Sequence, residues 1–77
     1  MKHFLEFVVR SLVDNPDDVQ ISEISGDKNP GYRVSLHPAD VGLVIGKGGR
    51  TISAIRSLIN AANKAGTHLA VEVVENT

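Results

Sequence analysis

The sequence contains no cysteine and no tryptophan, and only three of its 77 side chains are aromatic. Without cysteine, the chain can form neither disulfides nor thiolate metal sites. No apolar run approaches the roughly 18 residues that a membrane-spanning helix needs. Glu6 and Arg10 interrupt the apolar start, and no small-residue cleavage site follows it, which argues against a signal peptide. These absences predict a soluble intracellular protein.

Acidic residues are missing from one long segment of the chain. Between Val41 and Val71 the sequence has four lysines and arginines and no acid, whereas all nine acids lie outside this segment and the net charge is −1. A local excess of positive charge on an acidic body is typical of a focused anion site. The length and the 42% apolar content predict a single domain over residues 1–77 with one core.

In the first half of the chain, hydrophobic spacing predicts a helix and a hairpin. Apolar residues three and four apart predict a helix over 2–14, which Asn15-Pro16 ends. The predicted core face of this helix comprises Phe4, Leu5, Phe7, Val8, Val9 and Leu12. Two antiparallel strands over 18–25 and 32–37 follow, joined by the turn-rich loop from Ser25 to Gly31.

The second half predicts two helices and a last strand. Pro38-Ala39-Asp40 suits a helix start, so we expect a short helix over 39–45 that stops at Gly46. A second helix begins near Gly49 and ends at a Gly66 cap. Its predicted core face carries Ile52, Ile55, Ile59 and Ala62. The strand from His68 to Val74 is apolar enough for both faces to be partly covered. This order predicts an α+β fold of two layers, with three strands against three helices.

The stretch GLVIGKGGRTI, from Gly42 to Ile52, places four glycines and two cations between these helices. A glycine inside a helix is about 1 kcal/mol less favourable than alanine, so local stability does not explain them. A nucleotide P-loop is excluded, because Gly48 stands where that motif needs serine or threonine. The dinucleotide motif G-x-G-x-x-G also fails, because Thr51 replaces its third glycine and a helix precedes it.

The remaining pattern is a G-x-x-G loop between two helices, from Gly46 to Gly49. VIGKGGRTI resembles the signature of KH domains, which clamp a nucleic-acid backbone with such a loop. The order of elements resembles the bacterial (type II) KH arrangement, and the whole chain is similar to the family of small stand-alone bacterial KH-domain protein A. This resemblance implies a cytoplasmic, single-stranded RNA-binding protein that acts as an RNA chaperone and post-transcriptional regulator. It also implies pairing with a larger KH-containing protein or a second copy, and effects on cell elongation and cell-wall homeostasis.

Elementary chemistry supports an anion site at this loop. Glycines let a sugar–phosphate chain approach the backbone, and the unpaired N–H groups at a helix start attract phosphate. Arg50 adds a fork of donors suited to phosphate. The residues predicted to hold the RNA backbone are Gly46, Lys47, Gly48, Gly49 and Arg50. Those predicted to shape the groove are Gly42, Val44, Ile45 and Ile52, with Val44 or Ile45, or both, also in the core. Gly42 would leave a floor for a base or sugar, or would serve a helix contact.

Other readings stay open from the sequence alone. The chain could be mainly a protein-interaction or dimerisation module, which exposed apolar residues near Leu58–Ile59 or an unpaired edge at Leu69–Val74 would favour. Catalysis is not expected, because no carboxylate pair or Ser/His/Asp arrangement stands out. No cofactor or metal is expected, because the histidines are scattered: His3, His37 and His68. The strand face of Arg33, Ser35 and His37 is either a solvated sheet face or a polar edge of the groove.

The scarcity of aromatic residues limits the expected binding strength. With both phenylalanines assigned to the core, no stacking platform is available for bases. One loop should hold about four nucleotides. Its binding should be weak and salt-dependent, so that a second module on a partner or a second copy is needed. The sequence does not distinguish RNA from single-stranded DNA.

Overall fold

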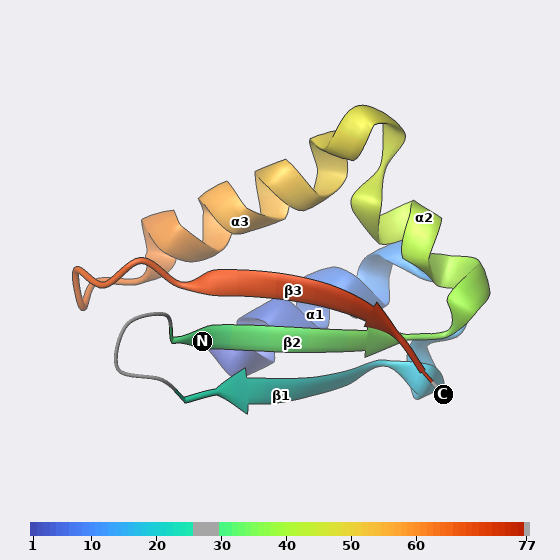
Figure 1. Cartoon of the computed structure of the whole chain (residues 1–77), viewed down its shortest axis with the longest axis horizontal. Coiled ribbons are helices and arrows are strands. Elements are labelled where there is room, and N and C mark those ends of the chain that lie inside the picture. The colour runs from blue at the N-terminus through green and yellow to red at the C-terminus, as the bar shows by residue number, and fades with distance from the viewer. Residues whose placement is uncertain (26–29, 77) are drawn as a thin grey trace.

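The computed structural model describes residues 1–25 and 30–76 of the chain. Within these residues lie three α-helices and three strands: α1 (Lys2–Leu12), β1 (Gln20–Ile24), β2 (Gly31–Leu36), α2 (Val41–Ile45), α3 (Arg50–Ala62) and β3 (Ala70–Glu75). In Figure 1, α1 lies behind the sheet and α3 runs above β3. The α+β class and the predicted order of elements are confirmed.

The sheet has β2 at its centre and β1 and β3 at its edges. β1 pairs with β2 antiparallel, as the hairpin predicted, whereas β3 pairs with β2 in parallel. Val34 lies opposite Ile21 on one side and opposite Val73 on the other. Because side chains alternate along a strand, this register directs one apolar face of the sheet toward the helices.

The opposite face of the sheet is polar and open. Arg33 of β2 and Glu72 of β3 form an ion pair at 3.2 Å there, with both side chains 53% exposed. Ser35 donates a hydrogen bond to the Asn76 side chain. His37 lies beyond the strand, where its Nδ1 accepts from the backbone N–H of Ala39 at 3.0 Å. Each member of this predicted polar face is thus engaged in a local contact.

One apolar cluster forms the core between the sheet and the helices. It consists of Leu5, Val9, Val19, Ile21, Val34, Leu36, Val44, Ile52, Ile55, Ile59 and Val71. The predicted 3–4 spacing of α3 is confirmed at its first three positions, but Ala62 is exposed, because the helix ends there. On the outer face of β3, Ala70 is half-buried and Val74 is 37% exposed, so this face is only partly covered.

The structure corrects the prediction for the first helix. α1 ends at Leu12 rather than 14, because Val13 has an extended backbone with φ −102° and ψ 159°. The phenylalanines do not belong to its core face, since Phe4 is 39% exposed and Phe7 is 70% exposed. Leu5 and Val9, about one helical turn apart, define the buried stripe, and Phe7 falls on the opposite side of the helix.

Several element boundaries also differ from the predictions. Residues Pro38–Asp40 form a 3₁₀ turn, so that α2 begins at Val41 rather than 39. α3 begins at Arg50, one residue after the predicted start, and its C-cap is Asn63 in an extended conformation rather than Gly66. β1 is shorter than predicted by two residues at its start and one at its end, β2 lies one residue earlier, and β3 begins two residues later and ends one later. Of the predicted loop from Ser25 to Gly31, residues 26–29 lie outside the described part of the chain.

Within residues 1–25 and 30–76, no helix combines the length and apolar character needed to cross a membrane. Over the same residues, histidine and acidic side chains nowhere gather in threes in a way that could hold a metal ion.

Candidate nucleic-acid interface

The connection between α2 and α3 is a tight turn whose shape depends on glycine. Gly46, Gly48 and Gly49 have φ values of 77°, 65° and 78°, in the region that side chains disfavour. The Gly46 N–H donates to the Gly42 carbonyl at 2.9 Å, and the Gly49 N–H donates to the Gly46 carbonyl at 3.1 Å. Because its own backbone bonds hold it, the turn has a defined shape without a ligand.

The glycines of this segment have different surroundings. A methyl group on Gly46 would collide with the side chain of Thr51, so that packing requires glycine there. A methyl group on Gly42, Gly48 or Gly49 would meet no other atom within 4 Å. Packing therefore explains only the first loop glycine, and open space adjoins the other three.

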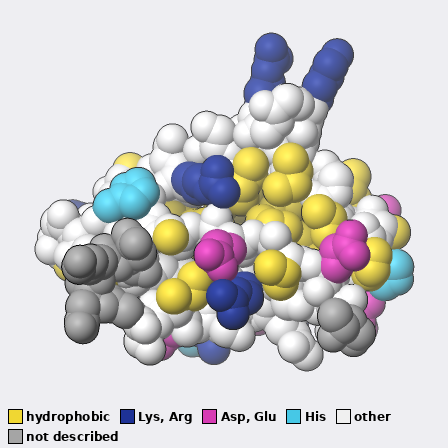
Figure 2. All heavy atoms as spheres, in the orientation of Figure 1, with side chains coloured by type: hydrophobic (Ala, Val, Ile, Leu, Met, Phe, Trp, Pro, Cys, Tyr) yellow, Lys and Arg dark blue, Asp and Glu magenta, His cyan; other side chains and the backbone are white. Residues whose placement is uncertain are grey.

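Two cations stand beside this open space. Lys47 and Arg50 are exposed, and neither joins an ion pair among the described residues. Figure 2 shows two basic side chains projecting from the top of the molecule, above the place where α3 begins in Figure 1. No side-chain cap hydrogen bond from a described residue closes the start of α3. The helix dipole adds partial positive charge at this end, so that Arg50 would gain from a bound anion.

The predicted groove residues divide into a surface group and a buried group. Gly42 is exposed and Ile45 is half-buried, so both are accessible beside the loop. Val44 is fully buried and Ile52 is 5% exposed, so they support the loop from the core. Figure 2 shows hydrophobic side chains gathered below the projecting cations, between the loop and the strands. The predicted core position of at least one of Val44 and Ile45 is confirmed.

Below the loop, the outer edge of β3 is partly closed by side chains of α3. The N–H groups of Ala70 and Asn76 donate to β2 and its flank, so that Leu69, Val71 and Val73 direct their backbone groups outward. The Asn60 amide donates to the Leu69 carbonyl at 3.0 Å and accepts from the Leu69 N–H at 2.7 Å.

One further contact from α3 covers the outer edge of β3, and the edge is open beyond it. Arg56 donates from Nε and Nη2 to the Val71 carbonyl at 3.3 and 3.2 Å. The N–H and C=O of Val73, farther along the edge, make no hydrogen bond of this kind with a described side chain. Sequence reasoning named Leu69–Val74 as an edge that could be unpaired, but it missed the partial closure by α3, although a polar pair four residues apart on that helix was a signal that could have found it.

A buried carboxylate fixes α2 relative to the rest of the fold. Asp40, which is 1% exposed, accepts from the backbone N–H of Asn15 at 2.9 Å and from its side-chain amide at 3.2 Å. A longer bond of 3.4 Å joins it to the N–H of Asp14. The sequence placed Asp40 in the first turn of the helix, but its side chain ties the end of α1 to the start of α2. The loop therefore projects from an anchored helix.

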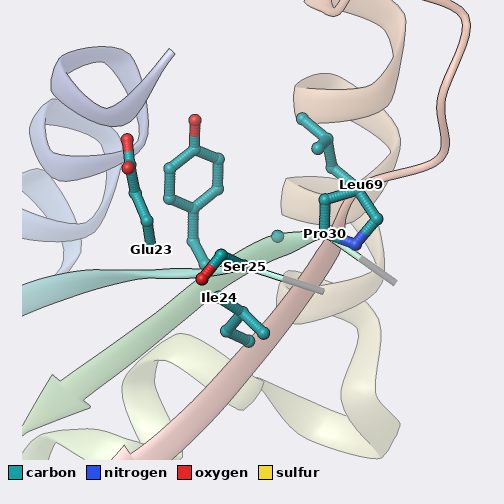
Figure 3. A pocket seen from close by; sticks show the side chains of 7 residues that line it. Glu23, Ile24, Ser25, Pro30 and Leu69 are labelled. Carbon is teal, nitrogen blue, oxygen red and sulfur yellow. The ribbon is translucent and has the colours of Figure 1, made fainter. Parts of the chain in front are cut away.

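A cavity of about 600 Å³ lies at the other end of the sheet, where β2 and β3 begin (Figure 3). Glu23, Tyr32 and Leu69 are among its described lining residues, which include no lysine or arginine. A carboxylate without a cation disfavours a phosphate, so the α2–α3 loop remains the better candidate for a nucleic-acid backbone.

Comparison with known proteins agrees with this geometry. A family model described as "KhpA/KhpB, KH domain" matches residues 2–73. The chain is 40% identical to "RNA-binding protein KhpA" of Chlamydia pneumoniae over 76 residues, which cover 97% of both chains. It is 44% identical to the protein of the same name in Clostridium acetobutylicum over 75 residues, or 96% of this chain and 100% of the relative. For the Mycobacterium tuberculosis protein of that name, the identity is 44% over 71 residues, with 92% and 86% coverage. The chain belongs to the KhpA/KhpB family of KH domains.

Proposed function

We propose that this chain binds single-stranded RNA without catalysis and that the loop from Gly46 to Gly49 holds the sugar–phosphate backbone. The observation that carries the proposal is the open space beside Gly48 and Gly49, whose φ values are positive and where an added methyl group would meet no neighbouring atom within 4 Å. The names of the relatives, which are called RNA-binding proteins, support the same function.

In this proposal, the backbone of one nucleotide stretch lies across the loop. The N–H groups at the start of α3 and the side chains of Lys47 and Arg50 surround a phosphate. Arg50 supplies a planar fork of donors, whereas Lys47 supplies a mobile charge. If these two cations each neutralise one phosphate, the logarithm of the binding constant should fall with the logarithm of salt at a slope of about −1.4.

The bases would then lie below the loop, over the groove. Gly42 leaves room for a base or sugar beside α2, and Ile45 offers an aliphatic surface. The outward N–H and C=O of Val73 can hydrogen-bond a base edge. Val44 and Ile52 contribute from beneath, by holding the loop in position. A footprint of about four nucleotides fits a loop of this kind.

The cellular part of the proposal rests on the family resemblance. A single weak site gains useful affinity when a second module acts beside it. We therefore propose that the chain, as one domain, works in the cytoplasm with a larger KH-containing partner or a second copy. Its proposed role is that of an RNA chaperone and post-transcriptional regulator that influences cell elongation and cell-wall homeostasis.

A second candidate function is protein interaction with little RNA binding by the chain itself. Phe7 on α1, which is 70% exposed, and Leu58 on α3, which is 45% exposed, favour it. Ile59, predicted as part of such a patch, is instead fully buried.

The two candidates separate in a fluorescence-anisotropy titration with a short unstructured RNA at low and moderate salt. The natural chain is compared with the double variant Lys47→Asp, Gly48→Asp, after circular dichroism has shown that both fold. Lys2→Asp, at the exposed start of α1, is a control that makes the same lysine charge reversal outside the loop. We expect salt-dependent binding by the natural chain and the control, and a loss of about 100-fold or more in the double variant, because like charges at an interface are strongly unfavourable.

Other outcomes are equally informative. If the double variant binds as well as the natural chain, the loop is not the site, and the segment around Arg56 and Lys64 becomes the next candidate. If no variant binds, the chain alone is not a sufficient RNA binder, and the interaction function is favoured. Size-exclusion chromatography of the same samples tests whether self-association survives the loop substitutions.

A further inference from the structure

Arg56 is oriented by the fold in a way that the backbone clamp does not require. It lies on α3, six residues after Arg50, and its Nε and Nη2 both donate to the Val71 carbonyl, at 3.3 and 3.2 Å. A guanidinium has five N–H donors, so three remain free: two on Nη1 and one on Nη2. Neither described ion pair involves Arg56. The bonds to β3 thus fix the plane of the guanidinium, while the pair of N–H groups at its far end, one on Nη1 and one on Nη2, stays available.

The position of Arg56 along β3 matters as much as its orientation. The Asn60 amide occupies both backbone groups of Leu69, and Arg56 occupies the carbonyl of Val71. Beyond them, Val73 directs its N–H and C=O outward. In Figure 1 this later part of β3 is the part that runs toward the end of the sheet bearing α2. The guanidinium therefore stands where the covered part of the edge meets the open part.

We propose that Arg56 is a base-reading residue, an inference that rests on the proposed RNA-binding function. Its free fork selects a base that presents two neighbouring acceptors, as guanine does with O6 and N7 and cytosine does with O2 and N3. Adenine presents an amino donor next to its acceptor on either edge, and this donor would face the donors of Arg56. Arginine is well suited to bidentate recognition of such acceptor pairs.

A phosphate contact explains the arrangement less well. Phosphates are contacted by exposed cations that can follow the backbone, as Lys47 and Arg50 can at the loop. Arg56 is also exposed, but its guanidinium is held at the strand edge by the Val71 carbonyl, beside the hydrogen-bonding groups that a base would meet. Fixed donors distinguish one base from another, because a mismatched donor cannot be avoided by a rotation of the side chain.

The test uses six-nucleotide RNAs that differ at one central position. The first is all adenine, and the others carry one guanine or one cytosine. We expect the natural chain to bind at least one of the substituted RNAs about 5- to 100-fold more tightly than the all-adenine RNA. Arg56→Lys keeps the charge but lacks the fork, so this ratio should fall toward one, mainly through loss of affinity for the preferred RNA. Arg10→Lys on α1 makes the same chemical change elsewhere and should keep the ratio.

The outcomes separate this inference from the function on which it rests. Equal binding of all RNAs by the natural chain overturns base reading and leaves the backbone clamp standing. An unchanged ratio in Arg56→Lys, together with a lowered thermal midpoint, shows that Arg56 only closes the strand edge. An equal loss of affinity for every RNA shows a phosphate contact and also overturns base reading. If the natural chain binds none of these RNAs, the proposed function and this inference fail together.

Discussion

The contact between β2 and β3 and the loop between α2 and α3 both contain glycine, but for different reasons. At Gly31 a methyl group would collide with the backbone of Ala70, and at Gly46 it would collide with Thr51. At Gly48 and Gly49 it would enter open space. A glycine that neighbouring atoms enclose is required by packing, whereas Gly48 and Gly49 are favoured only by their positive φ and have open space beside them for something outside the chain. The two kinds look identical in the sequence.

The largest effect on stability is expected at the strand contact. Gly31→Ala would force the paired backbones of Gly31 and Ala70 apart. Because backbone atoms cannot rotate away as a side chain does, we expect a loss of about 3 kcal/mol or more in the free energy of unfolding. Urea titration followed by circular dichroism measures it. An unchanged midpoint would show that the sheet can accommodate the methyl group, and that this contact does not enclose the glycine as the comparison assumes.

The next largest effect is expected at Gly46, which combines a collision with an unusual backbone. Its φ of 77° and ψ of 170° lie in a region that is essentially confined to glycine. Gly46→Ala should lower the free energy of unfolding by about 2–3 kcal/mol. Adding Thr51→Ala removes the contact with the Thr51 hydroxyl but leaves Thr51 Cβ at 2.7 Å, its backbone N at 2.9 Å and the backbone strain, so the double variant should recover only part of the loss. Full recovery would mean that the strain and the remaining contacts contribute nothing, and no recovery would mean that the contact with the Thr51 hydroxyl contributes nothing.

At Gly48 the effect on RNA should exceed the effect on the fold. Asparagine tolerates the left-handed conformation, so Gly48→Asn should lower the free energy of unfolding by about 1 kcal/mol or less. Its side chain would occupy space proposed for the RNA backbone, and we expect the affinity for RNA to fall about tenfold. Paired measurements of unfolding and anisotropy check this difference. The comparison between enclosed and open glycines breaks down if stability falls sharply while RNA binding is retained.

The smallest effects are expected at Gly42, where a substitution should raise the stability of the fold but lower the affinity for RNA. This glycine is helical and exposed, so Gly42→Ala should raise the free energy of unfolding by about 0.5–1 kcal/mol. If a base or sugar rests on this floor, RNA affinity should fall a few-fold at the same time. Thermal unfolding and anisotropy on one preparation test both parts. A more stable variant with unchanged affinity would remove Gly42 from the groove.

The features that sequence could predict are those that depend on one element or one short stretch. The 3–4 spacing of Ile52, Ile55 and Ile59 is sufficient to define the buried face of α3, and Gly46 marks the end of α2 by its neighbours alone. Element order follows from such local signals. The G-x-x-G loop was recognisable for the same reason, because its glycines and cations are contiguous.

The features that sequence could not supply depend on which elements become neighbours. Phe7 was assigned to the core because it is apolar, but only the packing of α1 shows which side of the helix faces the sheet. The bonds from Arg56 and Asn60 to the edge of β3 exist because that strand pairs in parallel beside α3. Similarly, Asp40 looked like a helix-start residue, whereas its partners are 25 and 26 positions earlier in the chain.

The parallel pairing of β2 with β3 also has a consequence for when the protein becomes competent during synthesis. Arg33 lies opposite Glu72, 39 residues later in the chain. The second edge of β2 therefore cannot pair until β3 has been synthesised. Contacts between residues so far apart in sequence form late, and they slow folding relative to local contacts. On the ribosome, the α2–α3 loop emerges well before residue 75, the end of the strand that completes the sheet beneath it. A nascent chain that already carries the loop therefore lacks one wall of the proposed groove until β3 has emerged.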